Sequence, residues 1–233
     1  YEPLVQGAAG MKHHSAAFLQ RLLGEARRRG VLLVADEVAV GFGRLGTLFA
    51  SEQVGVAPDL LCVGKGISGG YLPLAATLAT EGIFSAFLGD FSERKTFYHG
   101  HTYTGNPLAC AAGLASLETF TAERTRAAAV FGPKAERYAA GMRQLLELPH
   151  VDSARWRGLM GGVELVKDKA TREPYPFAER RGHRAILAAR ERGVMLRPLG
   201  DVAVLLPPLA ISLAELDLLF KVAEEAIREA TAR

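Results

Sequence analysis

Apolar positions along the chain follow helical and strand-like patterns in turn. Residues 16–29 carry apolar side chains at the spacing of an amphipathic helix, and Gly30 follows as a C-terminal cap. Residues 31–35 (VLLVA) then form an apolar run that is too short for a helix and too apolar for a strand with one wet face. We predict a strand buried on both faces there, and the same pattern predicts strands at 59–63 and 74–79. Helices alternating with buried strands are typical of an α/β fold with a parallel or mixed sheet.

The pattern changes in the second half of the chain. Pro107 predicts the start of a long helix, and beyond it short strands and helices resemble an α+β unit. We therefore predict two closely packed domains, residues 1–122 and residues 123–233. The later elements are expected as helices at 134–148, 178–192 and 213–232 and as strands at 153–158, 159–166, 194–198 and 202–206.

Composition and charge narrow the class of protein. With 49% hydrophobic and 23% charged residues among 233, the chain has the composition of a globular protein, which excludes disorder and collagen. The formal net charge is +3, and the basic residues form no stripe interleaved with aromatic residues. We therefore expect no nucleic-acid partner.

The cysteines and the length of the apolar runs indicate in which cellular compartment the protein is expected. Cys62 and Cys110 both lie in apolar surroundings, which is typical of reduced thiols, so we expect an intracellular, cytoplasmic protein. Apolar runs such as residues 202–206 are far shorter than the roughly 20 residues that span a bilayer, so we expect no membrane partner. The first residues show no signal-peptide pattern.

Two reactive residues follow predicted strands directly. Asp36 ends one strand in VADEVAVGFGR, where its carboxylate needs a cation or donors to offset desolvation. Lys65 follows the next strand in CVGKGISGG, where flanking glycines leave room for a flat ligand and a lowered amine pKa favours Schiff-base chemistry. Alone, each has a simpler interpretation, a turn cap for Asp36 and a surface lysine for Lys65. Together they predict one crevice at the carboxyl ends of neighbouring strands.

A third motif, FYHGHTYTGNPLACAA at residues 97–112, resembles a phosphate cradle at a helix start. His99 and His101 have no carboxylate or cysteine at ligand spacing, so we predict no metal site. The cradle would draw on the hydroxyls of Thr102 and Thr104 and the backbone N–H groups of Gly100 and Gly105.

In this order the three motifs resemble the class III aminotransferases that use pyridoxal 5'-phosphate, over essentially the whole chain. The resemblance implies the type I fold of that transferase class, with a mixed, mostly parallel sheet in a partial large domain and an α+β small domain. It also implies a homodimer with shared active sites. In that family the matching residues hold the pyridine nitrogen protonated (Asp36), bind the cofactor aldehyde covalently (Lys65) and bind the phosphate across the dimer interface (Thr102, beside Gly100).

Four stretches most resemble the biotin-synthesis branch of the family: VQGAAGM, ADEVAVGFGR, DLLCVGKGISGGYLPLAATL and GVMLRPLGDVAVLLPPL. That branch transfers an amino group to the keto acid 8-amino-7-oxononanoate. The resemblance implies that Arg197 binds the substrate carboxylate and that Arg44 lines the pocket. The simpler interpretations are a surface arginine at a strand end for Arg197 and a loop-closing salt bridge for Arg44.

Other interpretations stay open. Class III enzymes acting on ornithine, acetylornithine or γ-aminobutyrate tend to carry an arginine just before P-P-L, and residues 203–206 contain none. Another alternative is a non-catalytic module that uses the fold for protein contacts or to sense pyridoxal phosphate, and an intact set of Asp36, Lys65 and Thr102 argues against it. The small-molecule amino donor, S-adenosylmethionine or lysine, stays undecided. Residues 99–102 read HGHT where many members of the family have HGPT, and we assign no role to the resulting His101. Because the family is longer, we expect a fragment without the N-terminal phosphate loop and stacking aromatic residue, so activity would belong to the complete protein.

Overall fold

The computed structural model describes residues 1–122 and 124–232, which form two compact units. Unit 1 comprises Tyr1–Leu4, His14–Gly43 and Thr47–Arg124, and unit 2 comprises Val5–His13, Arg44–Gly46 and Thr125–Arg233. The predicted domain boundary between residues 122 and 123 falls on Glu123, which lies outside the described residues.

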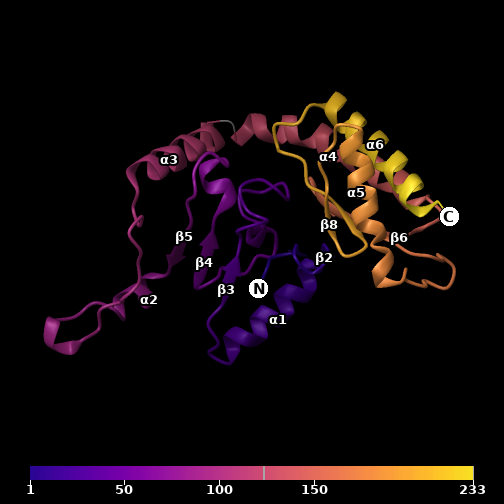
Figure 1. The fold of residues 1–233 in the computed structure, drawn as a ribbon. Helices are drawn as coiled ribbons and strands as arrows, with labels where there is room; N and C mark the ends of the chain where they lie inside the picture. The colour runs from indigo at the N-terminus through magenta and orange to yellow at the C-terminus, as the bar shows by residue number, and fades with distance from the viewer. Residues whose placement is uncertain (123, 233) are drawn as a thin grey trace. The chain divides into compact units, whose positions relative to one another are not determined.

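Unit 1 is built on a three-stranded sheet in the order β3-β4-β5 (Figure 1). Strands β3 and β4 are parallel and β4 and β5 antiparallel, which confirms a mixed sheet. The helices and strands of this unit are α1 (Ala16–Arg28), β3 (Val34–Asp36), β4 (Leu60–Val63), β5 (Ala76–Ala79), α2 (Glu81–Ser85) and α3 (Pro107–Ala122), with 3-10 helices η1 (Ala50–Gln53), η2 (Lys65–Ser68) and η3 (Phe91–Glu93).

Helix α1 confirms the predicted helix and its C-terminal glycine. The Ser15 side chain accepts a hydrogen bond from the Phe18 N–H at 3.1 Å, which satisfies one of the free donors at the helix start. Gly30 follows the helix with φ +70°, the left-handed conformation that glycine adopts without steric cost. Leu19 and Leu23 are the buried side chains of its apolar face.

The predicted burial of the sheet on both faces is wrong in part. Strand β3 begins only at Val34, and the preceding Val31 and Leu32 are 53% and 62% exposed. All four residues of β5 are exposed as well. The physical reason is that a sheet of three short strands is covered only where other elements of the described chain pack on it, as they do at Ala35 and Val63.

Unit 2 contains a four-stranded antiparallel sheet in the order β6-β7-β9-β8 and three long helices (Figure 1). All four predicted strands are present, whereas the short β1–β2 hairpin was not predicted. The helices and strands are β1 (Val5–Gln6), β2 (Lys12–His13), α4 (Arg124–Leu146), β6 (Val151–Arg157), β7 (Met160–Leu165), α5 (Arg181–Glu191), β8 (Arg197–Leu199), β9 (Val202–Leu205) and α6 (Leu213–Thr231), with the 3-10 helix η4 (Phe177–Glu179).

The core of unit 2 is centred on Tyr138 of α4. Its ring packs edge-on against Phe220 of α6 with ring centres 5.3 Å apart, and its hydroxyl donates to the Leu205 carbonyl at 2.7 Å. Burial of this hydroxyl raises the pKa of Tyr138. The predicted start of helix α4 at residue 134 is wrong, because the helix begins at Arg124 and continues through Pro133.

Candidate active site

Asp36 stands at the carboxyl end of β3. It is the last residue of the strand and lies in register with Cys62 on β4. Its Oδ1 accepts a hydrogen bond from the Val38 N–H at 3.0 Å, which orients the carboxylate over the following turn. The side chain is exposed, and no described residue donates to Oδ2. One carboxylate oxygen is therefore oriented by the backbone while the other is free to accept a hydrogen bond.

Lys65 follows β4 after one glycine, Gly64, and opens the 3-10 helix η2. It has φ +45°, a left-handed conformation that is uncommon for residues with a side chain and concentrates at functional sites. Lys65 is exposed, and within the described ranges its ammonium has neither an ion pair nor a hydrogen bond. The amine is therefore free to react.

Asp36 and Lys65 are brought to the same edge of one sheet. Strands β3 and β4 run parallel, and neighbouring strands lie roughly 5 Å apart. Lys65 is three residues beyond Cys62, the register partner of Asp36, so the backbones are separated by about 10 Å along the strand direction. This is the arrangement that the sequence predicts, since both residues follow the carboxyl ends of parallel strands.

The turn that carries Lys65 packs against the loop after Asp36. A Cβ placed on Gly66 would lie 2.7 Å from the Cβ of Phe42, so only glycine permits this approach. Phe42 is itself buried, adopts φ +53° and packs edge-on against Phe49 with ring centres 5.6 Å apart. The Gly-Phe-Gly segment and the Lys65 turn therefore fix one another.

Gly100 and Thr102 lie in the exposed loop that leads to α3. The Thr104 hydroxyl is used inside this loop, where it accepts the His101 N–H at 2.9 Å. The His101 ring is engaged too, because its Nδ1 accepts the Tyr103 N–H at 3.1 Å. Thr102 has no such partner among the residues that the structure describes. Of the two threonines, Thr102 is the one whose hydroxyl is available to a ligand.

The two predicted arginines belong to unit 2. Arg44 donates to the carbonyl oxygens of Pro207 at 2.5 Å and Leu159 at 3.5 Å. Burial lowers the pKa of its guanidinium, an effect that Tyr138 partly opposes. Arg197 opens β8 in register with Val204, and its side chain is exposed. Arg44 thus already ties backbone segments together, whereas Arg197 is open to a ligand.

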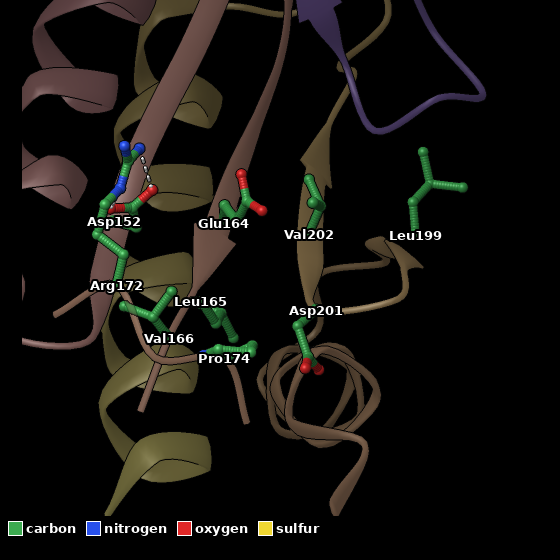
Figure 2. Close-up of a pocket in the computed structure, with 9 residues that line it drawn as sticks. All are labelled: Asp152, Glu164, Leu165, Val166, Arg172, Pro174, Leu199, Asp201 and Val202. Atoms are coloured by element: carbon green, nitrogen blue, oxygen red, sulfur yellow. Dashed lines mark hydrogen bonds and ion pairs between the residues drawn. The ribbon is translucent and has the colours of Figure 1, made fainter. Parts of the chain in front are cut away.

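A pocket of about 430 Å³ lies elsewhere on unit 2 and contains none of the predicted site residues (Figure 2). Its carboxylates already have partners. Asp152 is paired with Arg172 through two contacts of 2.8 and 2.9 Å, and this pairing lowers the pKa of Asp152. Asp201 accepts the Gly182 N–H at 2.9 Å. We therefore assign no function to this pocket. No cluster of three or more potential metal ligands occurs in the described part of the chain.

One residue of the site was missed from the sequence. Glu37 directly follows Asp36 and is completely buried, and its carboxylate accepts two backbone N–H groups. A charged residue at the end of an apolar strand is the one signal in the sequence that could have drawn attention to it.

The chain matches the family model for class III aminotransferases (Aminotransferase class-III) over residues 1–227, and it belongs to that family. It is 57% identical over 226 residues to the adenosylmethionine-8-amino-7-oxononanoate aminotransferase of Nitratidesulfovibrio vulgaris, a match covering 97% of this chain and 41% of that protein. It is 50% identical over 225 residues to the enzyme of the same name from Aquifex aeolicus, covering 97% and 49%.

Solved structures agree with this result. The crystal structure of adenosylmethionine-8-amino-7-oxononanoate aminotransferase from Methanocaldococcus jannaschii superimposes with a TM-score of 0.93 at 44% identity, covering 99% of this chain and 53% of that one. An (S)-enantioselective omega-transaminase from Thermomicrobium roseum gives a TM-score of 0.91 at 37% identity, covering 99% and 50%. The α/β transaminase fold is confirmed, and the chain spans about half the length of the curated relatives it matches. Within the described residues, every helix is too short or too polar to cross a bilayer.

Proposed function

We propose that residues 1–233 form part of a pyridoxal-phosphate-dependent aminotransferase of biotin biosynthesis. It would transfer an amino group to 8-amino-7-oxononanoate to give 7,8-diaminononanoate. The observation that carries the proposal is the placement of Asp36 and an unpaired Lys65 at the ends of neighbouring parallel strands. The names of the relatives at 44–57% identity support the choice of substrate.

The side chains of unit 1 fit pyridoxal phosphate. The cofactor presents a ring nitrogen, an aldehyde and a phosphate, and the unit offers the free Oδ2 of Asp36, the unpaired amine of Lys65 and the unpaired hydroxyl of Thr102 beside Gly100. The glycines around Lys65 keep bulky side chains away from a flat ring. When bound, the cofactor supplies an electron sink for the bond at the substrate α carbon.

Each residue would then have a distinct task. Asp36 holds the proton on the ring nitrogen, because an anion beside that nitrogen favours its cationic form. The Lys65 amine would hold the cofactor at its aldehyde, and as a free amine it would serve as the base that moves the proton at the substrate α carbon. Thr102 donates to the phosphate, in the family across the subunit interface. Arg197 offers two parallel donors to the substrate carboxylate, and Arg44 holds the segment beside the substrate pocket.

The assembly and domain division are part of the proposal. Residues 1–122 would form part of the cofactor-binding large domain and residues 123–233 the small domain, an assignment supported by the two units except for residues 5–13, 44–46 and 123–124. The exposed apolar segment, residues 71–114, favours a homodimer because large apolar surfaces mark interfaces. Its exposed side chains are Tyr71, Leu72, Leu78, Phe84, Phe87, Leu88, Phe91, Phe97, Tyr98, Tyr103, Leu108 and Leu114. The free thiols of Cys62 and Cys110 suit a cytoplasmic location.

Covalent trapping tests the proposal on this chain. Incubation with pyridoxal phosphate and reduction by borohydride should place the label on the peptide that contains Lys65. The Lys65→Ala variant should lose that label. Lys95 serves as the control, since it is paired with Glu93 at 2.6 Å and its replacement by alanine should leave the labelling unchanged. Labelling that persists at equal yield after Lys65→Ala would refute the assignment.

A second candidate is another ω-aminotransferase of the same class. The superposition on the Thermomicrobium roseum omega-transaminase favours it. The two candidates differ in the keto acid they accept. The activity of a protein containing residues 1–233 toward 8-amino-7-oxononanoate, compared with simple ketones and aldehydes, distinguishes them.

A further inference from the structure

Glu37 is a charged side chain that the proposed chemistry does not use. It is 0% exposed, and its Oε2 accepts the Ala50 N–H at 2.9 Å while Oε1 accepts the Ser51 N–H at 2.6 Å. These are the first N–H groups of η1, which a carboxylate satisfies well. Because both oxygens are occupied and the group is fully buried, Glu37 has no access to a substrate.

The backbone of Glu37 is held at the same time. Its N–H donates to the Cys62 carbonyl at 2.9 Å, which extends the link between β3 and β4 beyond Asp36. Its own carbonyl accepts the Gly41 N–H at 2.9 Å, and a Cβ on Gly41 would lie 2.8 Å from that carbonyl oxygen. Glu37 is therefore a junction at which the sheet, the loop after Asp36 and η1 meet.

The loop closed by this junction reaches both proposed cofactor residues. It begins at Val38, whose N–H orients the Asp36 carboxylate. It includes Phe42, which packs against Gly66 in the Lys65 turn and against Phe49 immediately before η1. Holding η1 to Glu37 therefore holds Phe42 in place, and Phe42 in turn limits the conformations of the Lys65 turn.

We propose that Glu37 is a positioning residue whose buried carboxylate fixes the loop of residues 38–49 and so presets Asp36 and Lys65 for pyridoxal phosphate. The inference rests on the proposed function of those two residues. It extends that function, because it assigns the geometry of the site to a residue that touches neither cofactor nor substrate.

The test compares Glu37→Gln with two controls in a complete protein containing residues 1–233, here called the parent chain. Glutamine keeps the shape but turns an N–H₂ donor toward a backbone N–H donor, so one hydrogen bond becomes a clash of donors. Glu52→Gln is the chemical control, since Glu52 of η1 also accepts a backbone N–H, that of Phe49 just before η1, but is exposed. Leu19→Ala is the stability control, because it removes buried apolar volume from α1 of the same unit.

Two readouts are measured in each variant. The first is the rate of borohydride-trapped pyridoxal phosphate labelling at Lys65, and the second is amide hydrogen exchange at residues 36–38, 50–51 and 64–67. Glu37→Gln should slow labelling by about tenfold, as expected when one buried hydrogen bond is lost, and should speed exchange in all three segments. Glu52→Gln and Leu19→Ala should label within about twofold of the parent chain.

The outcomes separate the two proposals. Labelling and exchange in Glu37→Gln equal to those of the parent chain would overturn the role of Glu37. If the parent chain itself does not label Lys65, the proposed function fails, and the exchange of residues 64–67 still decides whether Glu37 fixes that turn. Should Glu37→Gln not fold, Glu37→Asp keeps the charge but shortens the side chain by one methylene, so its carboxylate no longer reaches both the Ala50 and the Ser51 N–H groups. It should slow labelling in the same way, and unchanged labelling would count against the inference.

Discussion

Asp36 and Glu37 are adjacent carboxylates with opposite surroundings. Successive residues of a strand point to opposite faces, so a chain leaving β3 turns one of the two toward the open edge and the other toward the interior. The exposed residue keeps a free oxygen for a ligand, while the buried one is completely used by backbone donors. The same chemical group can therefore serve binding at one position and architecture at the next.

At Arg197 we expect a substitution to affect the substrate and not the cofactor. Arg197→Ala should weaken binding of 8-amino-7-oxononanoate by roughly 30- to 1,000-fold, about 2 to 4 kcal/mol, because a bidentate, charge-assisted contact to a carboxylate is lost. Arg197→Lys should rescue binding only in part, since an ammonium offers no parallel donors. The measurement is the KM for the keto acid in a protein containing residues 1–233. A KM within about threefold of the unmodified protein would make Arg197 a bystander.

The Asp152–Arg172 ion pair predicts a pH-dependent contribution to the stability of unit 2. Hydrogen bonding to Arg172 lowers the pKa of Asp152 below its ordinary value of 3.8. A lowered carboxyl pKa stabilises the folded state above pH 3.8, and this contribution is lost as the pH falls through the folded-state pKa. Asp152→Asn should therefore be less stable than the parent chain at neutral pH, and the two should converge under acid.

Urea unfolding followed by Trp156 fluorescence at a series of pH values checks this expectation, because Trp156 is the one tryptophan of the sequence. Arg172→Gln is the matched control, and it should produce the same loss without adding to that of Asp152→Asn. A constant difference between Asp152→Asn and the parent chain down to low pH would show that the ion pair is not the cause.

The sequence predicts those site residues whose position is set by the residues immediately before them in the chain. Asp36 and Lys65 could be placed because an apolar run ends immediately before each of them, and the structure puts both at one sheet edge. Glu37 could not be placed in the same way. Its burial depends on a contact with η1, which follows it only after the loop of residues 38–49. No local sequence pattern predicts that contact.

At the scale of elements, the sequence predicts well those helix ends that are set by a residue at the end itself. The predicted start of helix α1 at residue 16 and its glycine at residue 30 were confirmed, and the structure adds Ser15 as the N-terminal cap. The start of helix α4 was predicted wrongly. Pro133 lies inside the helix, and tertiary packing continues the helix across a residue that usually interrupts one. Strand β3 is shorter than its apolar run, since its pairing with β4 begins only at Val34, opposite Leu60.

The contact between α4 and α6 gives a prediction that reverses the usual rule for helix glycines. Gly141→Ala should destabilise unit 2 by about 1 to 3 kcal/mol, although alanine is the better helix former, because the new Cβ would lie 2.2 Å from the Phe220 ring. The midpoint of urea unfolding monitored by Trp156 should fall. Gly24→Ala in α1, where nothing lies within 4 Å of the new Cβ, is the control and should not lower stability. A midpoint that does not fall in Gly141→Ala would mean that the two helices separate readily.

At the scale of the whole molecule, the proposed dimer can be tested by mixing defects. If Thr102 serves the cofactor of the neighbouring subunit, a heterodimer of Lys65→Ala and Thr102→Ala subunits carries both lesions in one site and leaves the other intact. Two inactive preparations of a protein containing residues 1–233 should then regain part of the activity after exchange of subunits. Absence of recovery in verified heterodimers would place Thr102 in its own subunit's site or outside any site.

The exposed apolar segment has a consequence for how the chain is made in the cell. Figure 1 shows the chain leaving β5 through α2 and a long excursion before it returns to α3. Aromatic side chains along this path, such as Phe91 and Tyr98, are exposed. Such a stretch would emerge from the ribosome before the second subunit of the proposed homodimer could cover it, so it would be exposed to chaperones and to premature aggregation. Yield in a soluble form should therefore depend on how fast subunits meet, rising with slower, cooler synthesis, and not on the intrinsic stability of either unit alone.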